Sequence, residues 1–188
     1  MPSQKKLRIM ISSTVYGNES ILEQIYAVLS GYGYEVWMSH KGTLPTNPNK
    51  TTTDNCLEAV ANCDVYLGII TKRYGSVDST GISITHQEVK CSIAKAKLRW
   101  FLVHYDVTVA HDLLRQFRFD AQGAPISFPI QPTRSLENIG ILDMYDDVAG
   151  QKTGNWIQPY HNEADILNFI SSQFSDVAGI RQMLRGTP

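Results

Sequence analysis

Residues 64–104 read DVYLGIITKRYGSVDSTGISITHQEVKCSIAKAKLRWFLVH and contain two strand patterns with a helix pattern between them. The first run, residues 64–70, is apolar on both faces, which is typical of a central strand in a parallel sheet. Residues 82–97 contain an amphipathic helix pattern with Val89 on its apolar side, and residues 99–104 form the second strand. A strand, a helix and a strand in this order predict a βαβ unit with a right-handed crossover.

The residues before this unit show the same alternation. Residues 7–13 predict a strand, and Asn18 is expected to cap the helix that follows. Residues 34–38 predict a short aromatic strand, and Thr53 or Asp54 is expected to cap the next helix. The sequence therefore predicts an α/β fold, in which a doubly wound parallel sheet of four to five strands has helices on both faces.

The second half of the chain follows this alternation less clearly. Residues 109–119 predict a helix, and APISFPI (124–130) is a candidate fifth strand that its two prolines restrict to an edge of the sheet. Ser135 is expected to begin a helix, residues 150–160 to form a loop, and Asn162 to cap a final helix. The expected fold thus ends in C-terminal helices.

The length and composition exclude several classes of protein. A chain of 188 residues fits one domain, which we expect to span residues 1–175, with residues 176–188 as a tail or short helix. The formal net charge of −1 provides no field to attract nucleic acid. No run approaches the about 18 apolar residues that cross a membrane. Cys56, Cys63 and Cys91 contain no CxxC pair and suit reduced thiols, so we expect a cytoplasmic protein.

Polar side chains follow the strands where these are predicted to end. Residues of this kind are Ser12, Ser13 and Thr14 after the first strand, and Arg73, Tyr74 and Gly75 after residues 64–70. Because parallel strands place their carboxyl ends at one edge of the sheet, we expect these groups to share a crevice. Hydroxyls, backbone amides and cations suit a ligand with ribose and phosphate groups. Neither G-x-G-x-x-G nor G-x-x-x-x-G-K-[ST] is present, which excludes a P-loop for nucleoside triphosphates.

Glu88 lies near the start of the helix pattern, beside the expected crevice. A carboxylate at this place is a candidate for chemistry on a sugar. Thr85 and Glu88 also fit the T-x-x-E capping box, in which a Glu at the third helical position returns a hydrogen bond to the cap residue. The catalytic and the structural interpretation are compatible, and both stay open.

The histidines and cysteines do not predict a metal site. His86 and Glu88 match the H-x-E half of the zinc deaminase signature, but the P-C-x-x-C half that completes it is missing. The other histidines are scattered, without an acidic residue at metal-ligand spacing. We therefore expect neither a metal nor a separate cofactor.

Four segments of the chain carry a resemblance to a known family. They are KLRIMISSTVYGNES, DVYLGIITKRYGS, SITHQEVKCSIAKAK and NWIQPY. Together they resemble an uncharacterised domain family of the Toll/interleukin-1 receptor-like (TIR) clan over most of residues 6–175. Members often lie N-terminal to NTPase or repeat domains. The resemblance implies a flavodoxin-like parallel sheet.

The resemblance also implies an activity. Many TIR domains cleave NAD in cell-death or antiphage signalling, and a glutamate near the start of a helix in this region acts on the glycosidic carbon. Glu88 matches that glutamate, so the main expectation is an N-glycosidase in bacterial defence or stress signalling. Its substrate would be NAD or a related nucleotide, bound by the polar residues of the crevice. Two alternatives stay open: a non-catalytic assembly or signalling module, and a nucleoside deoxyribosyltransferase. Self-association or a separate partner protein is also implied.

Overall fold

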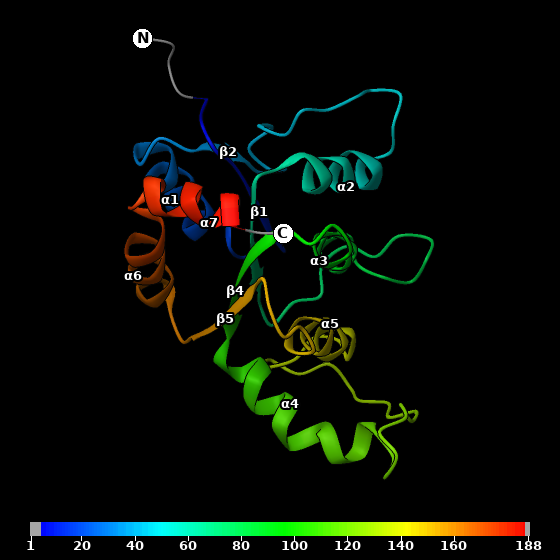
Figure 1. The fold of residues 1–188 in the computed structure, drawn as a ribbon. Coiled ribbons are helices and arrows are strands. Elements are labelled where there is room, and N and C mark those ends of the chain that lie inside the picture. Colours follow the sequence, from blue (N-terminus) through cyan, green and yellow to red (C-terminus); the bar gives the residue numbers. More distant parts are fainter. Residues whose placement is uncertain (1–4, 187–188) are drawn as a thin grey trace.

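A computed structural model of the chain describes residues 5–186 and contains a five-stranded parallel sheet (Figure 1). The strand order is β2-β1-β3-β4-β5, and every neighbouring pair is parallel. The strands are β1 (Arg8–Ser13), β2 (Glu35–Trp37), β3 (Val65–Ile70), β4 (Leu98–His104) and β5 (Asn155–Tyr160). This is the flavodoxin-like arrangement that the sequence predicts, with β3 at the centre and buried along its whole length.

The two faces of the sheet carry separate cores, because successive strand residues point to opposite sides. In β3, Val65, Leu67 and Ile69 join one core, whereas Tyr66 and Ile70 join the other. The first core is covered by helices α1 (Glu19–Gly31), α6 (Glu163–Phe174) and α7 (Val177–Gly186). The second is covered by helices α2 (Thr52–Asn62), α3 (Ile84–Ala94) and α5 (Gly140–Ala149).

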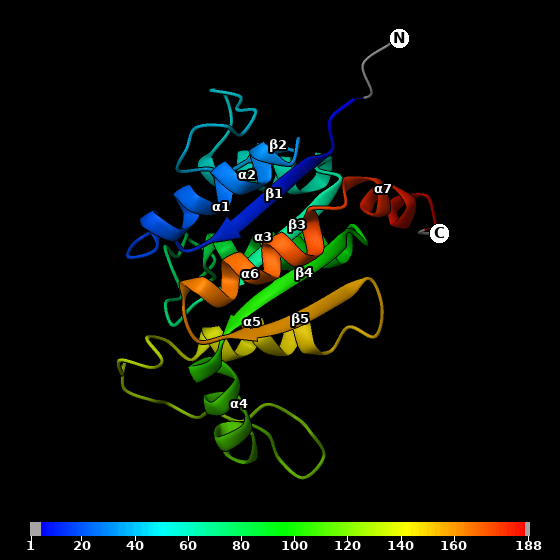
Figure 2. The same ribbon diagram turned by 90° about the vertical axis from the view of Figure 1, so that its left-hand side faces the viewer.

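Helix α4 (Tyr105–Arg118) follows β4 at the carboxyl end of the strands and extends away from the sheet (Figure 2). It begins at Tyr105, earlier than the sequence predicts, because the His104 side chain accepts a hydrogen bond from the Asp106 amide and caps the helix. Its buried contacts include Val107 in the second core and Arg118, which pairs with acidic side chains of α5. Among residues 5–186, no helix is both long and apolar enough to cross a membrane.

The helix caps differ from two sequence expectations. Thr51, rather than Thr53 or Asp54, caps α2 by accepting a hydrogen bond from the Asp54 amide. Ser83 caps α3 by accepting a hydrogen bond from the His86 amide. Both hydroxyls therefore lie two or three residues earlier than the pattern indicates, where the backbone is still extended.

The fifth strand also differs from its predicted place. Residues 124–130 form no strand and make only an isolated bridge between Phe119 and Pro125. The strand β5 instead lies in the segment predicted as a loop, where Pro159 is tolerated because β5 is at the edge of the sheet. Helix α5 begins at Gly140, not at Ser135.

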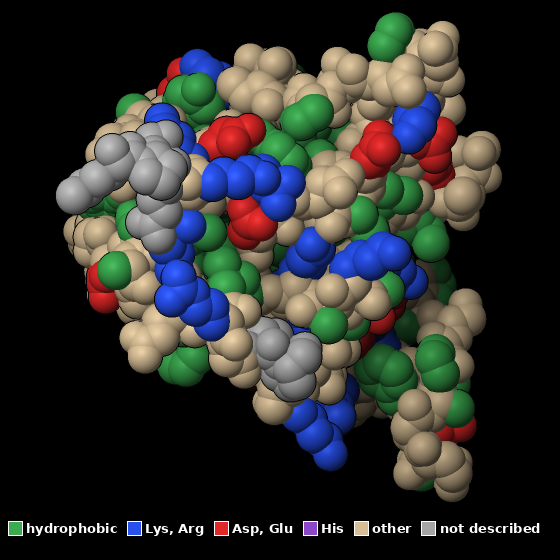
Figure 3. Space-filling model, turned by 45° about the horizontal axis from the view of Figure 1, so that its top comes forward, with side chains coloured by type: hydrophobic (Ala, Val, Ile, Leu, Met, Phe, Trp, Pro, Cys, Tyr) green, Lys and Arg blue, Asp and Glu red, His purple; other side chains and the backbone are tan. Residues whose placement is uncertain are grey.

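The face shown in Figure 3 carries Lys and Arg side chains in separate groups, with Asp and Glu between several of them. Within the described part of the chain, this face presents no continuous basic stripe of the kind that follows a nucleic-acid backbone. The mixed distribution agrees with the formal net charge of −1.

Candidate active site

A pocket of about 550 Å³ opens at the carboxyl edge of the sheet, where β1 and β3 end. We call it the Glu88 pocket. Side chains and backbone from four elements and the loops between them line it, among them Ser13, Thr14, Tyr16, Ser39, Thr52, Cys56, Arg73, Gly75, Ser76, Thr85, Glu88 and Glu137. The pocket therefore lies where ligands bind in open parallel sheets, as the sequence predicts.

Glu88 lies on the first half of α3 and is 5% exposed. The hydroxyl of Ser12, at the end of β1, donates a hydrogen bond to Oε2 of Glu88. The thiol of Cys56, from α2, also hydrogen-bonds to this carboxyl group. No Lys, Arg or His side chain within residues 5–186 forms an ion pair with Glu88. The carboxyl group is thus buried with two neutral donors and no compensating charge.

Glu88 has no capping function. Because Ser83 is the N-cap, Glu88 is the fifth residue of α3 and lies beyond the first turn, too far along to return a hydrogen bond to the cap residue. Thr85 lies inside the helix, is buried, and lines the pocket. The capping-box interpretation is therefore wrong, and the burial of the Glu88 carboxyl needs another explanation.

Burial raises the pKa of Glu88 to about 7, and the hydrogen bonds from Ser12 and Cys56 lower it only in part. Loss of hydration disfavours the charged carboxylate, whereas a hydrogen-bond donor favours it. Glu88 therefore changes its protonation state near neutral pH. Strongly shifted carboxyl groups in clefts are frequent at functional sites.

Replacement of Ser12 by Ala tests this balance of forces. Ser12→Ala removes a donor that favours the carboxylate, so the pKa of Glu88 should rise above its value in the parent protein. A hydrogen bond to a charged group contributes about 1.5–3 kcal/mol, which corresponds to a shift of roughly one pH unit or more. Titration of the Glu88 carboxyl carbon by NMR measures the shift. An unchanged or lowered midpoint would contradict the assigned role of Ser12.

The structure brings most of the predicted binding residues to the Glu88 pocket. Ser13, Thr14, Arg73 and Gly75 line it, and Ser12 lies behind it as the partner of Glu88. The loop after β3 approaches β1 closely: a Cβ at Gly75 would lie 2.9 Å from Oγ1 of Thr14, and the φ of +85° also favours glycine. The Thr14 hydroxyl in turn donates to the Arg73 carbonyl oxygen over 3.2 Å.

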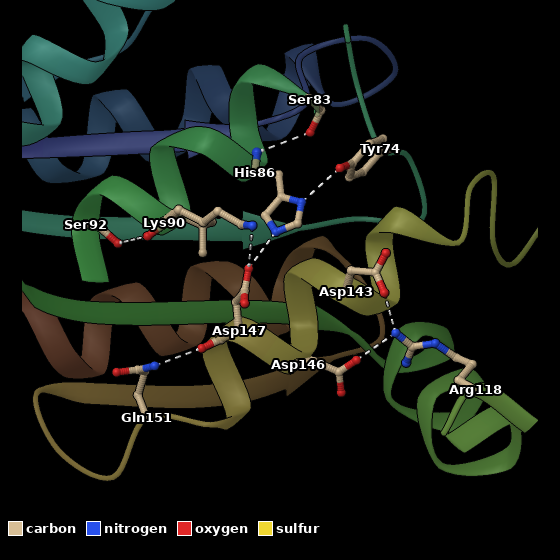
Figure 4. Close-up of polar contacts among 11 residues, drawn as sticks. Tyr74, Ser83, His86, Lys90, Ser92, Arg118, Asp143, Asp146, Asp147 and Gln151 are labelled. Carbon is tan, nitrogen blue, oxygen red and sulfur yellow. Dashed lines mark hydrogen bonds and ion pairs between the residues drawn. The ribbon is translucent and has the colours of Figure 1, made fainter. Parts of the chain in front are cut away.

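Tyr74 does not face the pocket, in contrast to the sequence prediction. Its ring packs against α5, where a Cβ at Gly140 would lie 2.6 Å from Cζ of Tyr74. Its hydroxyl lies 2.8 Å from Nδ1 of His86, and Nε2 of His86 lies 2.8 Å from Oδ2 of Asp147 (Figure 4). Tyr74 points into the second core because its neighbours Arg73 and Gly75 take the pocket side of the loop.

The Tyr74, His86 and Asp147 contacts join the pocket loop to α3 and α5 (Figure 4). The hydrogen bond from His86 lowers the pKa of Asp147, and Lys90 lies 3.6 Å from the same carboxylate oxygen. His86 is 3% exposed, so this network is part of the protein interior. It fixes the first turns of α3, and with them the position of Glu88.

Two residues of the site escaped the sequence analysis. The sequence predicts only a reduced thiol at Cys56, but this thiol contacts Glu88, and burial raises the pKa of the thiol to about 12. Glu137 accepts a hydrogen bond from the Tyr74 amide over 3.0 Å and lies 3.8 Å from Arg73. Glu137 belongs to an irregular segment, where no periodicity indicates which side chains return to the sheet. Among the described residues, no cluster of three or more His, Cys, Asp or Glu side chains could hold a metal ion.

Comparison with known proteins identifies the family. Residues 8–166 match the family described as "Domain of unknown function (DUF4062)". The chain belongs to the DUF4062 family. This agrees with the expectation of an uncharacterised domain family, whereas the matching family description gives no support to membership of the TIR clan. No curated protein matches the chain.

Two solved structures are similar to this DUF4062 domain. The CMP N-glycosidase BcmB of Clostridium botulinum has a TM-score of 0.48 and 13% sequence identity, over 88% of this chain and 98% of that one. The 2-deoxyribosyltransferase of the psychrotolerant bacterium Bacillus psychrosaccharolyticus has a TM-score of 0.43 and 19% identity, over 92% of this chain and 95% of that one. Likeness at this level does not transfer an activity to the chain.

Proposed function

We propose that this DUF4062 domain cleaves the N-glycosidic bond of a nucleoside or nucleotide, with Glu88 acting at the anomeric carbon of the sugar. The observation that supports this proposal is the Glu88 carboxyl group, buried in a pocket at the carboxyl edge of the sheet without a counterion. A charged carboxylate in such a place lowers stability, and no Lys, Arg or His side chain in residues 5–186 forms an ion pair that would compensate for its charge. A cationic reacting group would supply the missing positive charge.

Cleavage of an N-glycosidic bond generates such a charge. As the bond between the anomeric carbon and the base nitrogen breaks, its electron pair leaves with the base, and positive charge develops on the sugar ring. The ionised Glu88 stabilises that charge directly or forms an ester with the anomeric carbon. Water, or the hydroxyl or ring nitrogen of another acceptor, then bonds to the same carbon and passes its proton to solvent. In the ester route, this step breaks the bond between the anomeric carbon and Glu88 and restores the free carboxylate. The attraction between the Glu88 carboxylate and the cationic sugar is stronger in a buried pocket than in water.

The other residues of the Glu88 pocket suit a sugar ligand. Ser13, Thr14 and Thr85 place hydroxyl groups in its wall, and a hydroxyl can both donate and accept hydrogen bonds with ribose. Ser12 donates to Glu88 and so keeps one carboxylate oxygen oriented. The cation of Arg73 lies at the rim, where it can meet a phosphate group.

NAD is the substrate that we propose to test first. Nicotinamide carries its positive charge while attached to ribose, so it leaves as a neutral base without protonation by a general acid. A site that has one deeply buried carboxyl group can therefore perform this reaction. Pyrimidine nucleotides and deoxynucleosides need more assistance at the base, which makes them the next candidates.

Release of free base from a panel of substrates tests the proposed function. The purified domain is incubated at high concentration with NAD, with pyrimidine nucleotides, and with pairs of a deoxynucleoside and a second base, and the products are separated by chromatography. We expect base release from at least one substrate, and base exchange in the last pair would indicate a transferase. A complete lack of cleavage across the panel would contradict the proposal and favour a non-catalytic assembly module.

A further inference from the structure

A second and larger cavity, of about 780 Å³, adjoins the Glu88 pocket. We call it the outer cavity. The two share four lining residues: Ser13, Tyr16, Arg73 and Glu137. Arg73 lies between them with its guanidinium 4.4 Å from the centre of the Tyr16 ring. A ligand whose sugar occupies the Glu88 pocket can therefore extend past Arg73 into the outer cavity.

The floor of the outer cavity is apolar and its rim is cationic. The floor consists of side chains that also belong to the first core, namely Ile21, Leu22, Ile69, Tyr160 and Ile166. The rim carries Lys72, Arg73 and Arg134, together with the acidic side chains Glu137 and Glu163. Burial and the nearby Lys72 lower the pKa of His104, so this lining histidine is neutral at neutral pH. An apolar floor below a cationic rim suits an aromatic group that is attached to phosphate.

The cations of the rim are held loosely by the protein. Lys72 lies 3.6 Å from Asp106, and Arg73 lies 3.8 Å from Glu137, both longer than a charge-assisted hydrogen bond. Their side chains are 38% and 44% exposed, and ion pairs of this kind contribute little to stability. Arg134 forms no ion pair within residues 5–186. These three cations can therefore turn to an anionic ligand at little cost to the fold.

We propose that the outer cavity binds the phosphate-linked remainder of the substrate, with a diphosphate at Arg73 and Arg134 and a second nucleoside or similar group on the apolar floor. The substrate class is then a dinucleotide, not a free nucleoside. This inference rests on the proposed function for the placement of the reacting sugar. The binding of a diphosphate in the outer cavity requires no cleavage, so it can be measured separately.

Calorimetric titration with ADP and with adenosine tests this proposal. ADP should bind the parent domain at least about tenfold more tightly than adenosine, because charge-assisted hydrogen bonds to the diphosphate add to the contacts of the nucleoside. Arg134→Gln should weaken ADP binding by about tenfold and change adenosine binding by less than about twofold. Arg115→Gln, on the exposed side of α4 and outside both cavities, is the matched control and should bind ADP like the parent.

Two results would overturn the inference: ADP binding that is no tighter than adenosine binding, or ADP binding that Arg134→Gln and Arg115→Gln affect equally. The same titration with Glu88→Gln separates the two proposals. If ADP binds to both this variant and the parent but the parent cleaves no substrate of the panel, the outer cavity is confirmed and the proposed function fails. If free nucleosides are cleaved and ADP does not bind, the proposed function stands and the dinucleotide inference fails.

Discussion

Glu88→Gln is expected to abolish base release by the DUF4062 domain while the fold remains intact. Gln has almost the same shape as Glu, and its side-chain oxygen can still accept the hydrogen bond from Ser12. It lacks the negative charge that stabilises a cationic sugar, so turnover should fall by about a hundredfold or more. The initial rate of base release from the best substrate of the panel measures the effect, and circular dichroism of both proteins confirms the fold.

Glu58→Gln is the matched control for this substitution. Glu58 is an exposed carboxylate on α2 that pairs with Lys50 over 2.9 Å, outside the Glu88 pocket. Its replacement should leave the rate within about twofold of the parent, since exposed ion pairs contribute little. Equal rates for Glu88→Gln and the parent would show that Glu88 has no catalytic function. A loss of activity in both variants would point to a general effect of charge on the domain.

The sequence predicts the centre of this fold better than its periphery. Residues 64–70 are recognisable as a central strand because both of their faces are covered and therefore apolar. Strand β5 lies at an edge, where Trp156 is exposed and Pro159 is tolerated, so its composition is that of a loop. Periodicity identifies an element only where burial imposes the period.

The same limit applies to the candidate site. Glu88 and the serines after β1 could be predicted because strand order alone places them at one edge of the sheet. The direction of the Tyr74 side chain could not be predicted, because it depends on packing against Gly140, which lies in a helix far along the chain. Cys56 is recognisable from the sequence as a reduced thiol, but its contact with Glu88 depends on how α2 packs on α3, which sequence spacing does not show.

The raised pKa of Glu88 also has a consequence for stability. The carboxyl pKa is about 7 in the folded domain, against an ordinary value of 4.5, so the folded state holds this proton more tightly than the unfolded state does. The stability that the protonated form provides is complete below pH 4.5 and is lost as the pH rises through about 7. A shift of this size corresponds to about 3 kcal/mol of unfolding free energy.

Glu88→Gln should therefore be more stable than the parent at pH 8, although it removes a catalytic group. Gln remains neutral at every pH and resembles the protonated Glu88, so the two proteins should have similar unfolding free energies at pH 4. At pH 8 the variant should exceed the parent by up to about 3 kcal/mol. Urea unfolding of both proteins at several pH values between these limits measures the difference in their unfolding free energies. All other titrating groups are present in both proteins, so their contributions cancel in this difference. A difference that does not change with pH would mean that the Glu88 carboxylate is not destabilised by burial, and the main support for its catalytic assignment would be lost.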